Sequence, residues 1–285
     1  MFIDAHAHSM HAECDEEGRP QPPLMMEWRP EYGDPQDLIK EHNENGIERV
    51  LVLDPPEVLF ELKEVFKDFV VPVPLVNPDK TTPQDIHDLL ARGSVGIKFI
   101  APMHSYGDNR YLPLYEAVYE EDAIAIFHTG FLGHGLFEPG GLLGMDDCVD
   151  ITNMRPSALD RISRALPDLK IIMAHFGMPW WEEAWKMITS CKNIYGDLSG
   201  GTAIHKAMDM WVTMFRPNGR LHNASVEKLV FGSDCSYFKP NWTYYRDYID
   251  FHERLFDALD LSEELRTKIA RDNILSLIGA NASDT

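Results

Sequence analysis

The chain begins with a short apolar segment that carries two histidines, His6 and His8, in a His-x-His arrangement. If residues 2–8 form a strand, side chains alternate along it, so these two imidazoles point to the same face. We expect Asp4 to share that face one step deeper. Two neutral imidazoles that converge on one point are the beginning of a zinc-type site, although the motif alone also fits a strand end that faces water.

Other apolar runs also end in residues that can bind a metal or transfer a proton. Histidine follows two such runs, at His128 and His175, and aspartate follows a third, at Asp234. Lys98 lies within a fourth run. Any one of them could be an ordinary polar residue at a strand terminus. Their repeated position at the ends of separate strands favours convergence on one site.

These side chains suit metal-assisted acid–base chemistry. We predict that one divalent ion is held by three imidazoles and one carboxylate, those of His6, His8, His128 and Asp234. This ligand set suits Zn²⁺ and also admits Mn²⁺. A bound ion brings the pKa of water toward neutrality, and Asp234 and His175 are suited to move the proton that is released. The alternative for His175 is a structural histidine bonded to a backbone carbonyl.

The elements that position these residues alternate along the sequence. Strands are predicted at 2–8, 49–53, 70–77, 96–100, 124–128, 169–175, 193–198 and 228–234. Helices are predicted from the Asp34-Pro35 and Thr82-Pro83 pairs to the glycines at 46 and 93, and at 57–67, 112–121, 157–166, 180–189, 204–215 and 263–278. Eight alternations predict a (β/α)8 TIM barrel as one α/β domain over residues 1–285. In that fold the carboxyl ends of the strands form the catalytic face.

Two long loops are predicted on that face, 9–33 after the first strand and 130–152 after the fifth. Long loops within compact domains are usually functional lids or disordered. The apolar residues of the second loop favour a packed lid, which includes Phe131.

The sequence resembles the metal-dependent amidohydrolase superfamily, in particular the amidohydrolase-2 branch that includes aminocarboxymuconate-semialdehyde decarboxylase. The resemblance rests on motifs in the same order along the chain: Asp4-Ala-His6-Ala-His8, Gly96-Ile-Lys98, His128-Thr-Gly130, Ala174-His175-Phe-Gly177, Phe231-Gly-Ser-Asp234 and a closing helix from Lys268 to Leu277. It implies that His175 orients or activates water in a mononuclear site. In binuclear members the residue that matches Lys98 is carboxylated and bridges two ions. We favour a site with a single ion, and a two-ion site in which Lys98 and His175 hold the second ion is the alternative.

Residues for substrate binding are less strongly indicated. The resemblance implies that an arginine such as Arg155 grips a substrate carboxylate, but Arg155 could equally pair with a nearby acid such as Asp150. Trp180 and Tyr237 follow the sixth and eighth strands, and with Phe131 they suggest a pocket for a flat or apolar substrate. The alternative is that these aromatic residues pack against the lid or a partner subunit of a homo-oligomer.

The composition narrows the classes of partner. The chain has 46 acidic and 26 basic residues, a net charge of −20, and no basic run. This argues against nucleic acid and anionic membranes as partners, and favours a small-molecule substrate. The absence of a leader-like segment or a long apolar run, with four scattered cysteines, predicts a cytoplasmic protein.

Three functions fit these residues. The first, which we favour, is a hydrolase in which metal-activated water attacks a C–N or C–O bond of an amide or lactone. The second is non-oxidative decarboxylation of an aromatic or unsaturated carboxylic acid. The third is a non-catalytic binding protein, which is the weakest because every expected site position is filled.

Overall fold

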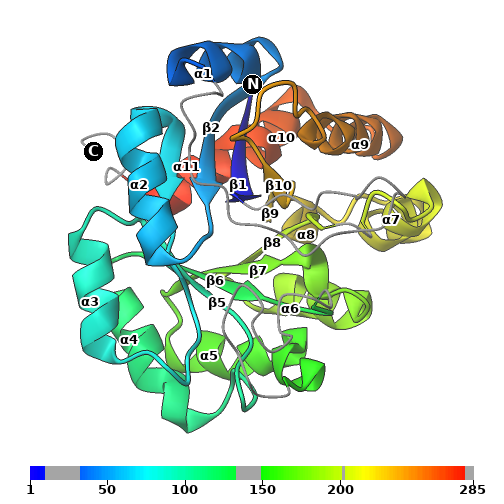
Figure 1. The fold of residues 1–285 in the computed structure, drawn as a ribbon. Coiled ribbons are helices and arrows are strands. Elements are labelled where there is room, and N and C mark those ends of the chain that lie inside the picture. The colour runs from blue at the N-terminus through cyan, green and yellow to red at the C-terminus, as the bar shows by residue number, and fades with distance from the viewer. Residues whose placement is uncertain (10–32, 133–148, 201–202, 280–285) are drawn as a thin grey trace, which may run out of the picture.

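Parallel strands lie in the interior of the protein and helices surround them (Figure 1). The computed structural model describes residues 1–9, 33–132, 149–200 and 203–279. The strands are β1 (Phe2–His8), β2 (Ile47–Val52), β3 (Val70–Pro72), β4 (Leu75–Val76), β5 (Gly96–Phe99), β6 (Ile124–His128), β7 (Lys170–Ala174), β8 (Ile194–Asp197), β9 (Leu229–Val230) and β10 (Cys235–Ser236). All eight predicted strands are present. The third is divided into β3 and β4, and the eighth is shortened to β9 and followed by β10.

The strands form two parallel sheets, in the orders β10-β1-β2-β3 and β4-β5-β6-β7-β8-β9. Backbone hydrogen bonds join the two sheets on both sides. The N–H of Leu75 donates to the carbonyl of Asp54 at 2.9 Å, and the N–H of Ala5 donates to the carbonyl of Phe231 at 2.9 Å. The strands therefore neighbour one another in sequence order, which is the arrangement of a (β/α)8 barrel, as predicted.

Several helices begin at the residues where the sequence predicts a helix start. They are α1 (Pro35–Glu44), α2 (Pro56–Phe66), α3 (Pro83–Ala91), α4 (Leu112–Glu120), α5 (Leu159–Ala165), α6 (Trp181–Ser190), α7 (Met208–Phe215), α8 (Asn223–Val226), α9 (Tyr245–Ala258), α10 (Glu263–Thr267) and α11 (Asn273–Ile278), with a π-helical turn at Lys268–Asp272. Asp34 caps α1, and Thr82 forms a capping box with Asp85 at the start of α3. Helix α9 was not predicted from the sequence, although its buried residues recur at helical spacing.

The apolar core has two parts, and β1 contributes to both. One part lies inside the barrel, where Ile3 and Ala5 pack with side chains from β2, β3, β6, β7 and β9 and from α11. The other lies between strands and helices and contains Phe2 and Ala7. Strict alternation along a strand would place Ala5 and Ala7 on one face, so the alternation in β1 is broken.

A β-bulge in β1 explains this break. Asp4 pairs with Val50 and Ala7 pairs with Val52, so three steps along β1 match two along β2. Beyond the bulge His6 and His8 face the interior, whereas Asp4 faces the outer layer and bonds to Tyr237. The prediction that Asp4 shares the face of the two histidines was therefore wrong, because the strand carries one extra residue.

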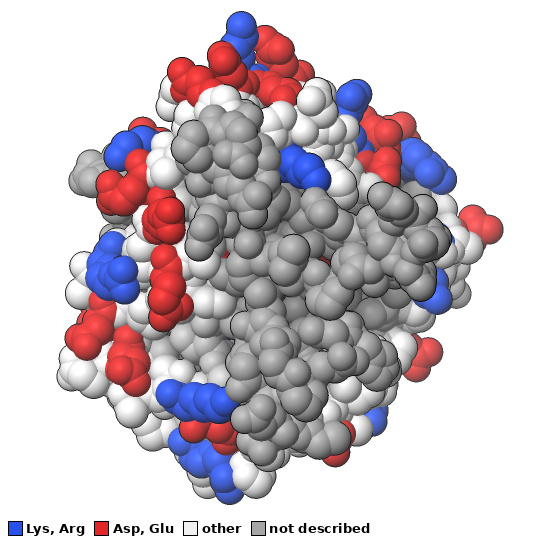
Figure 2. Space-filling model, in the orientation of Figure 1, with Lys and Arg blue, Asp and Glu red and all other residues white. Residues whose placement is uncertain are grey.

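Acidic and basic side chains are interspersed around the periphery of the face in Figure 2. Among the residues that the structure describes, no helix has both the length and the apolarity needed to cross a bilayer. Most of the two predicted long loops, 9–33 and 130–152, lies outside the described residues.

Candidate metal centre

Three side chains at the carboxyl ends of the strands direct ligand atoms to one point. His6 and His8 come from β1, and Asp234 lies between β9 and β10. The Oδ1 atom of Asp234 lies 3.4 Å from Nε2 of His6 and 3.2 Å from Nε2 of His8. In a tetrahedral zinc site with bonds of about 2.0–2.1 Å, ligand atoms lie roughly 3.3–3.4 Å apart. The two distances to Asp234 therefore match such a site, and the three ligand atoms all lie within 4.8 Å of one another.

Two further carboxylates hold the other nitrogens of both imidazoles. Nδ1 of His6 lies 3.0 Å from Oδ2 of Asp197, at the end of β8, and Nδ1 of His8 lies 3.1 Å from Oδ1 of Asp54, which follows β2. A carboxylate at Nδ1 favours the tautomer in which Nε2 is free to bind a metal. Neither acid was among the site residues predicted from the sequence. The signal was available, because each lies at or next to the end of a predicted strand.

The two imidazoles differ in their surroundings. Burial, and then the positive charge of Lys98, hold the pKa of His6 well below its usual value. Burial also disfavours the charged form of His8, but hydrogen bonds to Asp234 and Asp54 outweigh it and raise its pKa to about 9. A divalent ion would compete with that proton, since ligand histidines bind in the neutral form.

His128, the fourth predicted ligand, lies beside His175. Its Nδ1 atom is 3.2 Å from Nε2 of His175, and its Nε2 atom is 3.3 Å from the carbonyl oxygen of Phe131. Burial, with a further contribution from Lys98, lowers the pKa of His128 to about 3. The structure thus brings three of the four predicted ligands together in one cluster. The fourth, His128, is held by its contacts with His175 and with the carbonyl of Phe131.

Lys98 of β5 is fully buried and faces the same centre. Its Nζ atom lies 3.3 Å from Nε2 of His6. Burial lowers the pKa of Lys98 to about 8, against the attraction of Asp197 and Asp234. A lysine with such a pKa is partly neutral amine near neutral pH, which is the form that carboxylation requires.

His175 is connected to His6 through Ser199, which was not among the predicted site residues. Oγ of Ser199 lies 3.0 Å from Nδ1 of His175 and 3.1 Å from Nδ1 of His6, and it donates a hydrogen bond to Asp197. Burial, and then the nearby His128, hold the pKa of His175 well below its usual value. Only a strand-end position, with no recognisable motif, marks this serine in the sequence.

The backbone around His175 lies close to its imidazole and has an unusual conformation. His175 itself has φ 60°, and its N–H donates to Oδ1 of Asp197 at 2.8 Å. A Cβ atom on Gly200, which has φ 88°, would lie 2.7 Å from Nδ1 of His175. Left-handed backbone at a non-glycine residue is uncommon and often marks a functional site.

The predicted substrate residues lie in different environments. Arg155 forms a bidentate pair with Glu183 of α6, not with Asp150, and its guanidinium carbon lies 4.9 Å from the ring centroid of Trp180. Phe131 is 46% exposed. Tyr237 is fully buried and donates its hydroxyl hydrogen to Oδ2 of Asp4 at 2.5 Å. This geometry favours a positioning role for Tyr237 over substrate contact.

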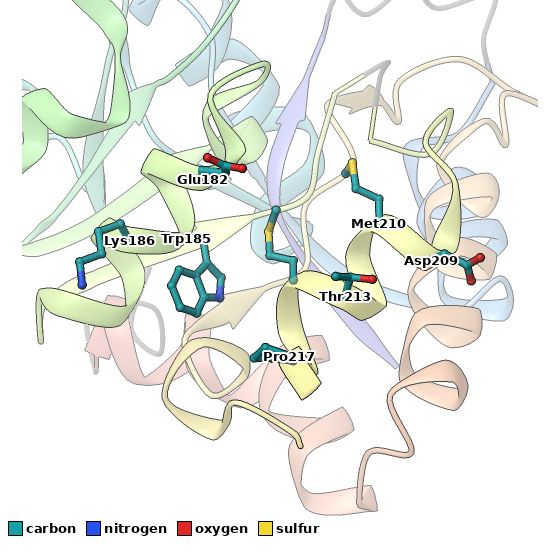
Figure 3. Close-up of a pocket in the computed structure, with 8 residues that line it drawn as sticks. Glu182, Trp185, Lys186, Asp209, Met210, Thr213 and Pro217 are labelled. Atoms are coloured by element: carbon teal, nitrogen blue, oxygen red, sulfur yellow. The ribbon is translucent and has the colours of Figure 1, made fainter. Parts of the chain in front are cut away.

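A separate hollow lies on the outer surface between α6 and α7 (Figure 3). It has a volume of about 760 Å³ and is lined by Glu182, Trp185, Lys186, Asp209, Met210, Thr213, Met214 and Pro217. None of these is a strand-end residue of the candidate centre. The hollow therefore belongs to the helical layer and not to the metal-type cluster.

Comparison with known proteins agrees with this fold. The model of the amidohydrolase family Amidohydro_2 matches residues 3–279. An uncharacterised TIM-barrel protein from Bordetella bronchiseptica is similar over 99% of both chains, with 17% identity and a TM-score of 0.63. A probable 2-pyrone-4,6-dicarboxylic acid hydrolase from Acinetobacter baumannii aligns over 98% of this chain and 99% of its own, with 16% identity and a TM-score of 0.59.

A third solved structure is that of a dihydroxybenzoic acid decarboxylase from Polaromonas sp. JS666 with bound manganese and the inhibitor 2-nitroresorcinol. It aligns over 85% of both chains, with 17% identity and a TM-score of 0.53. No curated protein matches the chain.

Proposed function

The chain belongs to the amidohydrolase family, and we propose that it is a metal-dependent hydrolase that cleaves an amide or lactone bond of a small organic molecule. The observation that carries the proposal is a buried histidine, His175, that lies next to the three-ligand cluster and is linked through Ser199 to Asp197. Hydrolysis needs a group that takes a proton from water and returns it to the leaving group. This arrangement supplies one.

We propose that one divalent ion is held by His6, His8 and Asp234, with His128 as a fourth ligand. The donor set of nitrogen and oxygen atoms suits Zn²⁺, and it also suits manganese, which the Polaromonas decarboxylase binds. When bound, the ion would polarise the scissile carbonyl and lower the pKa of an attacking water. The spacing of the ligand atoms and the two carboxylates behind His6 and His8 support this assignment.

In this proposal the chain's own residues handle the proton. Nε2 of His175 or a carboxylate oxygen of Asp234 accepts a proton as the water oxygen bonds to the carbonyl carbon. The same proton then passes to the leaving nitrogen or oxygen as its bond to carbon breaks. Ser199 and Asp197 hold the imidazole of His175 in one tautomer while this happens. Phe131, Arg155 and Trp180 are our candidates for substrate contact.

One observation favours a second candidate, non-oxidative decarboxylation. The buried Nζ of Lys98 faces the centre, where an ammonium group would attract a substrate carboxylate. In that reaction the carbon–carbon bond to the carboxylate breaks, carbon dioxide leaves, and a proton takes its place on carbon. His175 could supply that proton from the same position.

Metal analysis and product identity test the two candidates. The purified protein is analysed for metal and then assayed with lactones, amides and aromatic acids in ¹⁸O-labelled water. Incorporation of ¹⁸O into the organic product supports hydrolysis, whereas release of carbon dioxide with an unlabelled organic product supports decarboxylation. About one ion per chain with unmodified Lys98 supports the single-ion site. Two ions bridged by carboxylated Lys98 would overturn that site. Asp234→Asn serves as the control that should lose both metal and activity.

A further inference from the structure

We infer that Asp4 is a positioning residue that fixes, from behind, the two chain segments that carry His6 and Asp234. The inference rests on the proposed metal centre and goes beyond it, because Asp4 itself faces away from the centre. The bulge in β1 separates it from His6 and turns its side chain into the layer between strands and helices.

The carboxylate of Asp4 accepts four hydrogen bonds. Oδ1 accepts from the N–H of His6 at 2.9 Å and from the N–H of Ser233 at 3.1 Å. Oδ2 accepts from the hydroxyls of Ser233 and Tyr237, each at 2.5 Å. A carboxylate has about four lone-pair sites, so these four donors use all of them, and burial raises the pKa of Asp4 to about 7. Both oxygens are buried, and such a fully satisfied buried network specifies one arrangement of the groups it joins.

Two of these donors belong to the backbone next to the proposed ligands. One is the N–H of His6 itself, and another is that of Ser233, which immediately precedes Asp234. A direct bond completes the link, from the N–H of Asp234 to the carbonyl of His6 at 2.7 Å. Asp234 has φ 65°, a left-handed conformation that needs such support in a non-glycine residue. The 3.4 Å separation between His6 Nε2 and Asp234 Oδ1 therefore depends on contacts made by Asp4.

Tyr237 anchors this network to the helical layer. Its ring stacks on Tyr245 of α9, with centroids 4.6 Å apart, and lies edge-on to His42 of α1 at 5.2 Å. The carbonyl of Tyr237 accepts a hydrogen bond from Nε2 of His42 at 2.7 Å. Packing from two helices thus holds the hydroxyl of Tyr237 against Asp4. The hydroxyl of Tyr245 contacts Nδ1 of His42 instead, at 2.9 Å.

This difference between two stacked tyrosines provides a matched pair of variants. Tyr237→Phe removes one donor to Asp4 and keeps the ring, whereas Tyr245→Phe removes a hydroxyl from the same aromatic cluster without touching Asp4. Asp4→Asn is the stronger change, because its amide would present hydrogens to two of the four donors. For each metal-free protein we would measure Zn²⁺ affinity by competition with a chromophoric chelator, the visible spectrum with Co²⁺, and the thermal midpoint.

We expect Tyr237→Phe and Asp4→Asn to weaken Zn²⁺ binding by roughly 10–100-fold and to shift the Co²⁺ bands, as loss of outer partners of metal ligands does. Tyr245→Phe should leave both unchanged, even if its thermal midpoint falls. Wild-type affinity and spectrum in Tyr237→Phe would overturn the inference, as would an equal loss in Tyr245→Phe. If Asp4→Asn does not fold, Tyr237→Phe decides alone.

The same measurements separate this inference from the proposed function. If the wild type binds Zn²⁺ and the variants bind it equally well, only the positioning role of Asp4 is overturned. Failure of the wild type to bind Zn²⁺, Mn²⁺ or Co²⁺ removes both the metal centre and the positioning role that depends on it.

Discussion

The buried histidines inside the barrel differ from those in the layer between strands and helices. His6 and His8 each have a carboxylate at Nδ1 and Asp234 near Nε2. His42 of α1 and His252 of α9 are just as buried, yet their hydrogen bonds go to tyrosine oxygens and backbone carbonyls. Burial lowers the pKa of each outer histidine to about 4.

The comparison shows that burial alone does not make a histidine a site residue. An imidazole surrounded by apolar and neutral groups becomes a fixed, uncharged packing residue. An imidazole held by a carboxylate on one nitrogen and facing a second carboxylate with the other has its tautomer fixed and a ligand atom directed at a shared point. His175 lies between these two types, because its imidazole contacts Ser199 and His128 and is linked to the carboxylate of Asp197 through the serine.

The largest expected effect therefore concerns His175. If it belongs with the interior histidines as a proton-transfer group, His175→Asn should lower kcat by roughly 10²–10⁴-fold while most of the metal stays bound. Steady-state kinetics and metal content of the same preparation provide the measurement. A variant that loses its metal would show that His175 is a ligand, and a variant with unchanged kcat would place it with the structural histidines.

A smaller effect is expected when the carboxylate behind His8 is removed. Asp54→Asn keeps the size of the side chain but weakens the contacts with Nδ1 of His8 and with the N–H of Ser9. We expect metal affinity to fall by roughly 10–100-fold, since the tautomer of His8 is no longer fixed. Chelator competition checks this result. An affinity equal to that of the wild type would mean that the carboxylates do not distinguish the two kinds of histidine.

The last effect concerns stability at pH 4, at an outer histidine away from the centre. The pKa of His252 is about 4 in the folded protein and about 6.5 when unfolded. Because the folded value is depressed, the unfolded chain binds more protons between these values, so stability is lost as pH falls from 6.5 toward 4. His252→Phe should reduce this loss by up to about 3 kcal/mol at pH 4.

Denaturant unfolding at pH 7 and pH 4 measures the effect, and metal affinity at pH 7 is the control. Unchanged pH dependence in His252→Phe would show that the pKa of this imidazole is the same in the folded and unfolded states. A loss of metal affinity in His252→Phe would show that His252 is coupled to the metal centre, although the part of the chain that the structure describes shows no contact that links the two.

Much of the fold could be predicted because its signals are local. Apolar runs bounded by turn residues gave all eight strand positions, and the Asp34-Pro35 and Thr82-Pro83 pairs marked helix starts that the structure confirms. Helix α9 was not predicted because its apolar periodicity is hard to recognise among its many charged and aromatic residues. The strand-end positions of Asp54 and Asp197 are visible in the sequence, but their role depends on the histidine that each contacts in the folded protein.

The sequence by itself determined which chemical groups reach the carboxyl ends of the strands, since parallel strands in a barrel all end on one face. Tertiary structure decided how those groups pair. A single extra residue in β1, visible only in its register with β2, turned Asp4 outward and His6 inward. Likewise His128 pairs with His175, and Tyr237 points to Asp4, because partners distant in sequence fill the space on each side of them. Local patterns specify elements, whereas contacts between distant segments specify which atoms meet.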